Sequence, residues 1–160
     1  RTHRIHAFGY YQVNPEITVG ANFTAQSGRP KNCFGNYGGT NPDGDPGYGS
    51  AFFYCSVTDA AGVVQKDGSG NAVIAATPRA SQGRLPWDYT LDMNVVYKPA
   101  AFKGLTLRAD VFNLLNKQTV QAINEVHEND NDPTSLLETY RSPIGYTAPR
   151  AVKLTAQYEF

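Results

Sequence analysis

The sequence has no long hydrophobic run, and no stretch approaches the roughly 20 consecutive apolar residues of a membrane helix. This excludes a helical membrane protein. The chain also has no excess charge of either sign, because 14 Lys and Arg residues balance 14 Asp and Glu residues. A chain with no net charge gives no indication that it binds nucleic acid or attracts an acidic substrate electrostatically. Leu, Glu and Lys are sparse, whereas Gly, Asn, Thr and Tyr are plentiful, which favours β-structure over helix.

The residue arrangements of enzymes are absent as well. No nucleophile, base and orienting group come together in the sequence, and no Gly-rich phosphate loop precedes a helix. We therefore expect no enzymatic activity and no bound cofactor.

Cysteine is scarce: the chain has only Cys33 and Cys55. Both fall in one irregular segment, without the C-x-x-C spacing of metal sites. We expect them to form a disulfide in an oxidising compartment, and two free thiols are the alternative.

Alternation of apolar and polar residues predicts strands instead of helices. The predicted strands lie at about 2–13, 17–26, 87–98, 105–112 and 150–160. The last of them ends on an aromatic residue, with one apolar face made of Val152, Leu154, Ala156, Tyr158 and Phe160. A transmembrane β-barrel needs such a closing strand, with the apolar side toward lipid and the end at a water interface. A C-terminal strand ending in Phe resembles the signal by which bacterial outer-membrane barrels are inserted.

The third predicted strand has aromatic residues at both ends of its apolar face. Trp87 and Tyr89 begin this face, Tyr97 ends it, and aliphatic residues lie between them. The distance from Trp87 to Tyr97 is roughly 33 Å along the strand at about 3.3 Å per residue. When tilted by about 40°, this strand spans roughly 25 Å, the height of the lipid-facing band of a barrel. We interpret these aromatic residues as a girdle at the lipid boundary.

The connectors between the predicted strands alternate between short and long. Residues 14–16 and 99–104 form short turns, whereas about 27–84 and 116–147 are long, polar segments rich in turn residues. Within the first long segment, 51–54 and 73–75 could pair as a small hairpin. Outer-membrane barrels have short periplasmic turns and long extracellular loops, so the C-terminus would be periplasmic.

Five strands are too few to close a barrel, since the smallest have about eight. An open sheet would leave unpaired edges in lipid, which is not tolerated. The chain also begins at Arg1, with no Met and no signal peptide. We therefore expect residues 1–160 to be the C-terminal part of a larger antiparallel barrel.

Several side chains are candidates for a substrate-contact or metal site. The charged residues on the presumed lumen face would form an interstrand ladder or contact a substrate path: Asp88, Asp92, Arg108, Asp110, Lys153 and Glu159. His3 and His6 should lie on opposite faces of a strand and so cannot share a metal. His127 stands alone in a loop, solvated or facing the lumen. Segments 43–45 and 128–132 lack the complete calcium-loop pattern, so solvated loops are expected, with adventitious calcium as the alternative. No metal site is predicted.

One motif resembles a known family. The fourth strand runs into Phe112-Asn113-Leu114-Leu115-Asn116, which resembles the penultimate-strand signature Phe-Asn-Leu-x-Asn of TonB-dependent receptors. Ser27-Gly28-Arg29-Pro30 and Gly83-Arg84-Leu85-Pro86-Trp87 are similar to segments of the Oar-like branch. The alternation breaks at Asn113, and because Asn tolerates left-handed backbone, we expect a bulge or turn there.

The resemblance implies a function and partners. The chain would supply the last five strands of a barrel of about 22 strands in the outer membrane of a Gram-negative bacterium. Its partners would be outer-membrane lipid, the barrel-assembly machinery, an unknown transported substrate and, through an N-terminal plug that is not in this sequence, the TonB complex. The alternative interpretation is a secreted, disulfide-stapled β-sandwich that serves in binding or adhesion.

Overall fold

The computed structural model describes residues 1–36, 52–129 and 132–160. The regular elements in these ranges are all strands, the sheets are antiparallel, and no helix occurs in them. No helix in the described ranges is therefore long and apolar enough to cross a membrane. The chain forms two compact units. We call residues 1–28, 86–119 and 146–160 the sheet unit, and residues 29–85 and 120–145 the loop unit.

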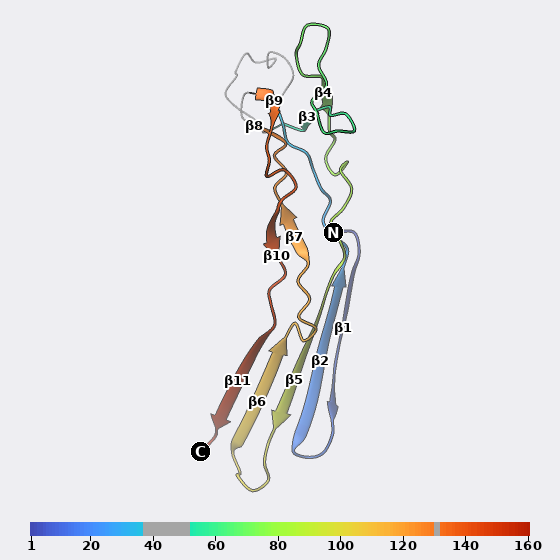
Figure 1. The fold of residues 1–160 in the computed structure, drawn as a ribbon. Coiled ribbons are helices and arrows are strands. Elements are labelled where there is room, and N and C mark those ends of the chain that lie inside the picture. Colours follow the sequence, from blue (N-terminus) through green and yellow to red (C-terminus); the bar gives the residue numbers. More distant parts are fainter. Residues whose placement is uncertain (37–51, 130–131) are drawn as a thin grey trace. The chain divides into compact units, whose positions relative to one another are not determined.

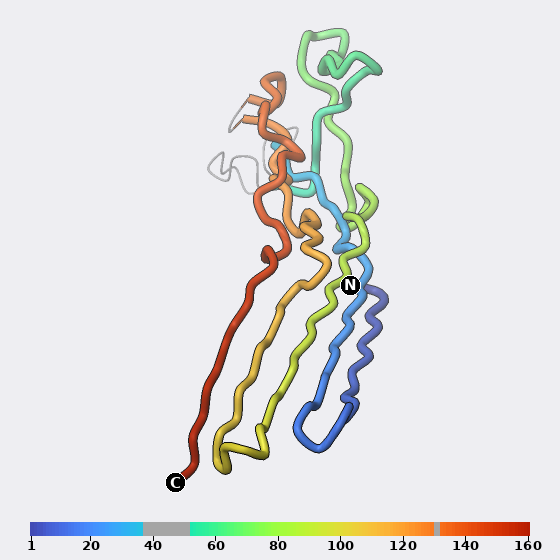
Figure 2. The backbone as a smooth tube through the Cα atoms, turned by 60° about the horizontal axis from the view of Figure 1, so that its bottom comes forward, coloured from blue at the N-terminus to red at the C-terminus, as the bar shows by residue number. Residues whose placement is uncertain are grey.

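The sheet unit is a single five-stranded sheet with the order β1-β2-β5-β6-β11 (Figure 1). Its strands are β1 (Arg4–Gln12), β2 (Ile17–Gln26), β5 (Asp88–Tyr97), β6 (Leu105–Phe112) and β11 (Ala151–Tyr158). Every neighbouring pair is antiparallel, and Figure 2 shows the chain running back and forth along the sheet. The five predicted strands are thus confirmed, with ends that differ by a few residues. The sheet is open, with β1 and β11 at its edges, and the described residues do not close it into a barrel.

Two tight turns connect neighbouring strands at one end of the sheet. In the first, the Asn14 side chain accepts hydrogen bonds from the backbone N–H of Glu16 and Ile17, at 2.9 and 2.8 Å. In the second, Gly104 adopts a φ of +87°, a backbone conformation that residues with a Cβ rarely adopt. A Cβ at Gly104 would also collide with the Glu159 carbonyl, so this turn requires glycine. We call this end of the sheet the Tyr97 end and the opposite end the Trp87 end.

The sheet unit has no hydrophobic core of its own. The buried apolar side chains of the described residues are Cys33, Cys55, Val64, Leu85 and Ile123, and all five belong to the loop unit. In a soluble sheet, at least one face packs against another layer and buries its apolar residues. This sheet buries none of them on either face.

The loop unit contains short strands. These are β3 (Tyr54–Ser56), β4 (Ile74–Ala76), β7 (Val120–Ile123), β8 (Glu128–Asn129), β9 (Asp132–Leu136) and β10 (Pro143–Tyr146). They pair as β3 with β4, β7 with β10, and β8 with β9. The predicted small hairpin is present but shifted along the chain, since Cys55 pairs with Ala75 and the strands start later than expected. Residue 51 of that prediction lies outside the described ranges.

Candidate functional site

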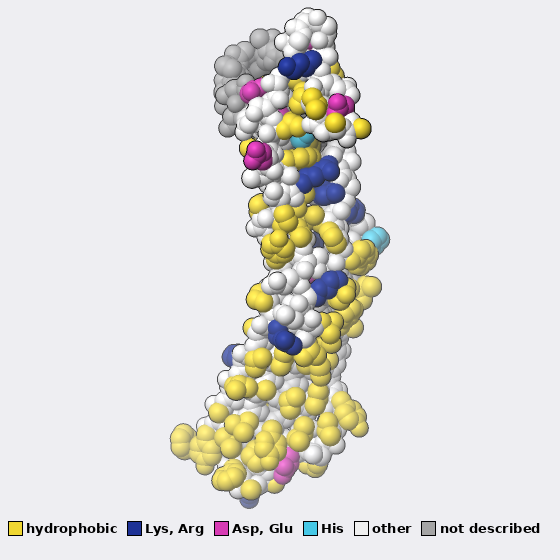
Figure 3. Space-filling model, in the orientation of Figure 1, with side chains coloured by type: hydrophobic (Ala, Val, Ile, Leu, Met, Phe, Trp, Pro, Cys, Tyr) yellow, Lys and Arg dark blue, Asp and Glu magenta, His cyan; other side chains and the backbone are white. Residues whose placement is uncertain are grey.

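One face of the five-stranded sheet is apolar across all of its strands. The register places Tyr11, Val19, Val95, Ala109 and Leu154 side by side, one from each strand. Tyr11 is 72% exposed and Leu154 is 77% exposed, so no second layer among the described residues covers them. Hydrophobic side chains accordingly spread over the strands in the space-filling view (Figure 3). We call this surface the apolar face.

Aromatic residues lie at both ends of the apolar face. Trp87, Tyr89 and the His3 ring that stacks on Trp87 mark the Trp87 end. Tyr97 pairs with Ile17 at the opposite end, where Tyr158 and Phe160 also lie, with their rings in edge-to-face contact at 5.2 Å. Trp87 is 48% exposed and Tyr97 is 38% exposed. The face therefore has an aliphatic middle between two aromatic borders.

The residues of the predicted insertion signal share this apolar face. Val152 pairs with Val111, Leu154 with Ala109 and Ala156 with Leu107, and Tyr158 pairs with Leu105. All of them are exposed, as is Phe160, which follows the end of β11. The alternation read from the sequence is thus present in the sheet.

The opposite face of the sheet carries the charged side chains, and we call it the polar face, although the exposed aromatic rings of Phe8 and Tyr10 lie on its β1 edge. Asp110 pairs in register with Lys153 and with Asn94, and its carboxylate lies 2.6 Å from the Arg108 guanidinium. A hollow of about 510 Å³ opens on this face near β6 and β11, and Arg108, Asp110 and Lys153 contribute to its wall. The charges on this face are therefore neighbours across the strands, as a ladder requires.

Asp88 and Asp92 extend this ladder toward the Trp87 end. The Asp88 carboxylate accepts hydrogen bonds from Gln26 at 3.1 Å and from Thr147 at 2.9 Å. Asp92 accepts a backbone hydrogen bond from Asn113 at 2.8 Å, and it lies 3.4 Å from the amide of Asn22. The Asn22 amide oxygen in turn lies 2.6 Å from His6. Since His6 belongs to the polar face and His3 stacks on Trp87, the two histidines serve opposite faces, as predicted.

The motif Phe112-Asn113-Leu114-Leu115-Asn116 forms the turn after β6. Asn113 and Asn116 have φ values of +48° and +50°, so the left-handed backbone expected at Asn113 is confirmed. The Asn113 amide donates to the carbonyls of Ala148 at 2.8 Å and Lys117 at 3.1 Å. Asn116 accepts a hydrogen bond from the Arg150 backbone at 3.1 Å. Both asparagines thus join the chain that leaves β6 to the chain that enters β11. Phe112 is half-exposed on the polar face, while Leu114 donates its N–H to the Leu91 carbonyl at 2.7 Å.

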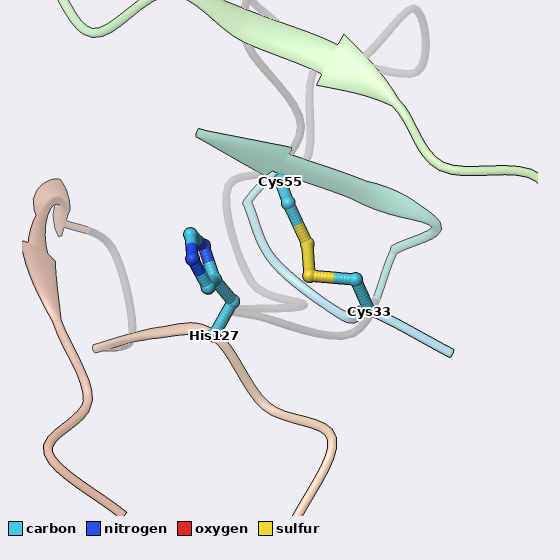
Figure 4. A group of neighbouring side chains, drawn as sticks. All are labelled: Cys33, Cys55 and His127. Atoms are coloured by element: carbon cyan, nitrogen blue, oxygen red, sulfur yellow. A yellow bond between two sulfur atoms is a disulfide. The ribbon is translucent and has the colours of Figure 1, made fainter. Parts of the chain in front are cut away.

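The loop unit contains a second cluster, built around a disulfide between Cys33 and Cys55 (Figure 4). Both half-cystines are buried, at 3% and 5% exposure. The Tyr140 hydroxyl donates to the Cys33 sulfur at 3.3 Å, and the His127 ring lies edge-on to Tyr140 at 4.6 Å. One ring nitrogen of His127 and the two sulfurs all lie within 4.8 Å of one another, a spacing that a metal ion could use. The sulfurs are bonded to each other, however, so neither is a thiolate ligand.

A buried carboxylate connects three segments beside this disulfide. Glu128 has no solvent exposure. It accepts hydrogen bonds from the Asn36 backbone at 2.8 Å and from both the backbone and the hydroxyl of Ser56, and it lies 3.2 Å from His127. Burial alone would raise the pKa of Glu128, but the hydrogen bonds from His127, Asn36 and Ser56 outweigh it and hold the pKa below its ordinary value.

A second carboxylate, Glu125, binds the segment at the start of the loop unit. It accepts hydrogen bonds from the Asn32 backbone at 2.7 Å and from the Arg29 guanidinium at 3.1 Å. Partial burial would raise the pKa of Glu125, whereas the bonds from Asn32 and Arg29 lower it, and the lowering prevails. Two ionised glutamates therefore join segments that are distant in sequence. Asn32 is 93 residues from Glu125, and Asn36 is 92 residues from Glu128.

Two expectations about this region are wrong. His127 is not solvated, because it is 8% exposed and packs against Tyr140. Glu128 does not belong to a solvated acidic loop, because it is fully enclosed by its donors. The candidate calcium segment 43–45 lies outside the described residues, as do residues 130 and 131 of the other candidate. The sequence contained no signal for the pairing of Glu125 or Glu128 with distant backbone donors.

Comparison with known proteins gives one relative. No family model matches the chain, and no solved structure matches it. A TonB-dependent transporter, Oar, from Myxococcus xanthus is 24% identical over 199 aligned residues. The match covers 100% of this chain and 16% of the transporter, so the chain spans about a sixth of that relative. The chain is therefore distantly similar to part of a TonB-dependent transporter.

Proposed function

We propose that this chain is the C-terminal barrel segment of a TonB-dependent receptor or transporter of the Oar-like branch in a bacterial outer membrane. The observation that carries the proposal is the sheet with two unlike faces and no core. Its apolar face runs from Tyr11 to Leu154 without a buried side chain, and its polar face holds a ladder of charges. In this role the apolar face contacts lipid and the polar face forms part of the lumen wall.

The energetics of the apolar face support a lipid environment. Burying apolar surface contributes about 25 cal/mol per Å², and a contiguous exposed apolar patch on a soluble protein rarely exceeds a few hundred Å². This face extends across five strands, and none of its apolar side chains is buried. Lipid acyl chains remove it from water without any second protein layer. The aromatic residues at both borders suit the membrane–water interfaces, where rings with a polar edge are favoured.

The open edges of the sheet support its place in a larger barrel. The outer backbone edges of β1 and β11 have no neighbouring strand in the sheet. Unpaired backbone groups are not tolerated in lipid, so further strands of a longer protein would pair with both edges. The barrel-assembly machinery would insert the protein.

The connectors support an orientation. The turns at 13–16 and 98–104 are short, whereas 27–87 and 113–150 are long. In outer-membrane barrels the short turns face the periplasm, so in this proposal the C-terminus would be periplasmic and the long segments would be extracellular. The Cys33–Cys55 disulfide fits an oxidising exterior. The long segments would capture the transported substrate, and coupling to the TonB complex would come through a plug elsewhere in the protein. No enzymatic activity is proposed.

The sandwich alternative makes a different demand on the same residues. A soluble β-sandwich buries the inner face of each sheet against a second sheet. Trp87 and Tyr97 would be among the residues covered, and here both are exposed. No observation on the described residues favours this alternative.

A pair of matched substitutions in the full-length protein tests the proposal. Leu91 lies in the middle of the apolar face, and its neighbour Thr90 belongs to the polar face, where it pairs with Thr24. Leu91→Arg would place a charge near the bilayer midplane at a cost of about 2–4 kcal/mol and should lower the amount of folded, heat-modifiable protein in the outer-membrane fraction. Thr90→Arg should leave that amount near the wild-type level. Equal assembly of the two variants would show that the faces are assigned wrongly.

A further inference from the structure

Three side chains of the kind that bind metals meet inside the loop unit. Cys33, Cys55 and His127 come from three separate segments and point toward one another (Figure 4). All three are buried, at 3%, 5% and 8% exposure, and their ligand atoms lie within 4.8 Å of one another. In the disulfide, the two sulfurs are bonded to each other. Once that bond is reduced, the same cluster presents two thiols and an imidazole, a ligand set that zinc prefers.

Backbone hydrogen bonds hold these three segments together in addition to the disulfide. Phe34 follows Cys33, and its carbonyl accepts the backbone N–H of His127 at 2.8 Å. Gly35 and Phe52 exchange backbone hydrogen bonds at 3.0 and 3.1 Å, which pairs the two cysteine segments with each other. Because these bonds do not involve sulfur, the three ligands should stay close together when the sulfur–sulfur bond is broken.

Glu128 supports the same arrangement and also orients the histidine. Its carboxylate accepts hydrogen bonds from the backbone N–H groups of Asn36 and Ser56, and Ser56 directly follows Cys55. The same carboxylate lies 3.2 Å from Nδ1 of His127. When Nδ1 donates its proton to this carboxylate, Nε2 presents its lone pair to a metal. Metal-binding histidines almost always donate their other ring N–H to a carboxylate, a carbonyl or water, so this pair has the form of a metal ligand with its support.

The charge and spacing of the reduced cluster suit a zinc ion. Zinc bound by two thiolates and a neutral imidazole carries no net charge, so its burial leaves no unpaired charge. Two thiolates at about 2.3 Å from one zinc ion lie about 3.8 Å apart at the tetrahedral angle. Side-chain rotation can supply that separation for Cys33 and Cys55, whose Cα atoms are 6.3 Å apart. The Tyr140 hydroxyl donates to the Cys33 sulfur at 3.3 Å and would stabilise a thiolate there.

We propose that Cys33, Cys55 and His127 form a zinc site when their disulfide is reduced, and that the disulfide and the zinc complex are alternative states of one cluster. A dithiol reductant, such as a thioredoxin-type protein, transfers two electrons and two protons to the disulfide and itself becomes a disulfide. Binding of Zn²⁺ to the two thiols then releases two protons. The reverse of these steps forms the disulfide again and expels the ion. Because the site lies within the loop unit, it does not depend on the proposed function.

Cobalt binding to the purified full-length protein tests the site. The protein is reduced with dithiothreitol, the reductant is removed under nitrogen, and Co²⁺ is added as a spectroscopic probe for Zn²⁺. The reduced variant Cys33→Ser/Cys55→Ser supplies the baseline, because it keeps any cysteines elsewhere in the protein. Above that baseline, reduced wild type should show the charge-transfer band of a cobalt–thiolate bond and the strong visible bands of tetrahedral cobalt. Zn²⁺ should abolish both, and oxidised wild type should show neither.

A substitution at His127 tests the third ligand. His127→Gln should weaken Zn²⁺ binding, measured by competition with a chromophoric chelator, by at least about tenfold. His6→Gln is the matched control, because His6 belongs to the polar face of the sheet unit, and this variant should bind Zn²⁺ as wild type does. Peptide mapping of the oxidised His127 variant, with the Cys33–Cys55 disulfide formed as in wild type, shows that it has folded.

Three results would overturn the zinc site. The first is reduced wild type without a cobalt–thiolate band above the baseline, and the second is equal cobalt binding by oxidised and reduced wild type. The third is an unchanged Zn²⁺ affinity in the folded His127→Gln variant. The comparison of reduced with oxidised wild type needs no substitution, so it decides even where a variant does not fold. None of these measurements depends on where the protein is located, so their failure would leave the proposed function standing.

Discussion

At the scale of single residues, Glu128 shows what the loop unit depends on. Its carboxylate is fully enclosed, and it accepts hydrogen bonds from Asn36 and Ser56, which lie on separate segments. Hydrogen bonds to a charged group contribute about 1.5–3 kcal/mol each, and an enclosed donor that loses its acceptor costs more than the bond itself. A single carboxylate thus has a large share in the stability of this unit.

Replacing Glu128 with Gln should loosen the segments that it joins. We expect a loss of about 2 kcal/mol in local stability, which is about thirtyfold faster amide exchange at Asn36 and Ser56 in hydrogen–deuterium exchange of the full-length protein. Glu138→Gln is the matched control, because Glu138 is exposed in the same unit and its exchange pattern should match wild type. Unchanged protection in the Glu128 variant would contradict the role assigned to this carboxylate.

Acid should destabilise the segments that Glu128 and Glu125 hold, because protonation removes the charge of both carboxylates. The folded pKa of each carboxyl lies below the ordinary glutamate value of 4.5. The stabilisation is therefore present above pH 4.5 and is lost as the pH falls through the lowered folded pKa. Amide exchange at Asn32 and Asn36, corrected for the intrinsic pH dependence, should be constant from neutral pH to about 5 and accelerate only in stronger acid. Acceleration that begins near neutral pH would point to a different group.

These residues mark the limit of sequence-based prediction at this scale. The run that contains Glu128 is rich in Asp and Asn, a composition that ordinarily indicates a solvated loop. Its burial depends on donors 72 and 92 residues away, and no local pattern encodes a partner at that distance. His127 was mispredicted for the same reason, since Tyr140 and the disulfide cover it.

At the scale of elements, the turn after β6 combines backbone and side-chain requirements at one residue. Asn113 has a φ of +48°, is 4% exposed and bonds to Ala148, which lies just before β11. A residue with a Cβ pays about 1–2 kcal/mol in the left-handed region, and Asn lowers that cost by bonding locally. Two different substitutions can therefore separate the two requirements.

Asn113→Gly should be milder than Asn113→Ala. Gly adopts the left-handed backbone readily and loses only the amide hydrogen bonds. Ala loses the same hydrogen bonds and is also strained in the left-handed backbone, so the Ala variant should be less stable than the Gly variant by about 1 kcal/mol. In the folded full-length protein, the temperature at which heat-modifiability is lost should fall in the order wild type, Gly variant, Ala variant. Identical temperatures for the two variants would mean that the backbone conformation is not the limiting requirement.

Strands were predictable where alternation alone specifies them. β11, and β5 apart from Val96, bear opposite kinds of residues on their two faces, so their existence could be inferred from the sequence. The strands β7 and β10 have four residues each, and β8 has two, which is too short for a period of two to stand out. Side chains such as Glu125 and Asn124, and not strand propensity, hold their surroundings in place.

At the scale of the whole molecule, the two units have different sources of stability. The loop unit has a small core that includes Cys33, Val64, Leu85 and Ile123, together with a disulfide that spans 22 residues. The sheet unit has strand pairing and no core. The distinction could not be read from composition, because apolar residues are present throughout the sequence and only the structure shows which of them are covered.

The joint substitution Cys33→Ser/Cys55→Ser should therefore affect the units unequally. Loss of a disulfide that closes a loop of this size costs about 3 kcal/mol. In the proposed outer-membrane setting, we expect faster protease cleavage within residues 29–85 on intact cells, while the amount of folded protein in the outer-membrane fraction stays near wild type. A proportionate loss of assembled barrel would show that the sheet depends on the disulfide, contrary to the division into two units.

The uncovered apolar face changes what natural variation can do to this protein. In a close-packed core, each side chain must match its neighbours in volume, so even one extra methylene is felt. Val152 and Leu154 have no protein neighbours above them to match. The acyl chains that would cover this face in the proposed role accept a larger or smaller side chain equally well, provided that it is apolar. Selection on this surface would therefore conserve polarity and leave size free, so that related sequences could drift in shape while keeping their alternation.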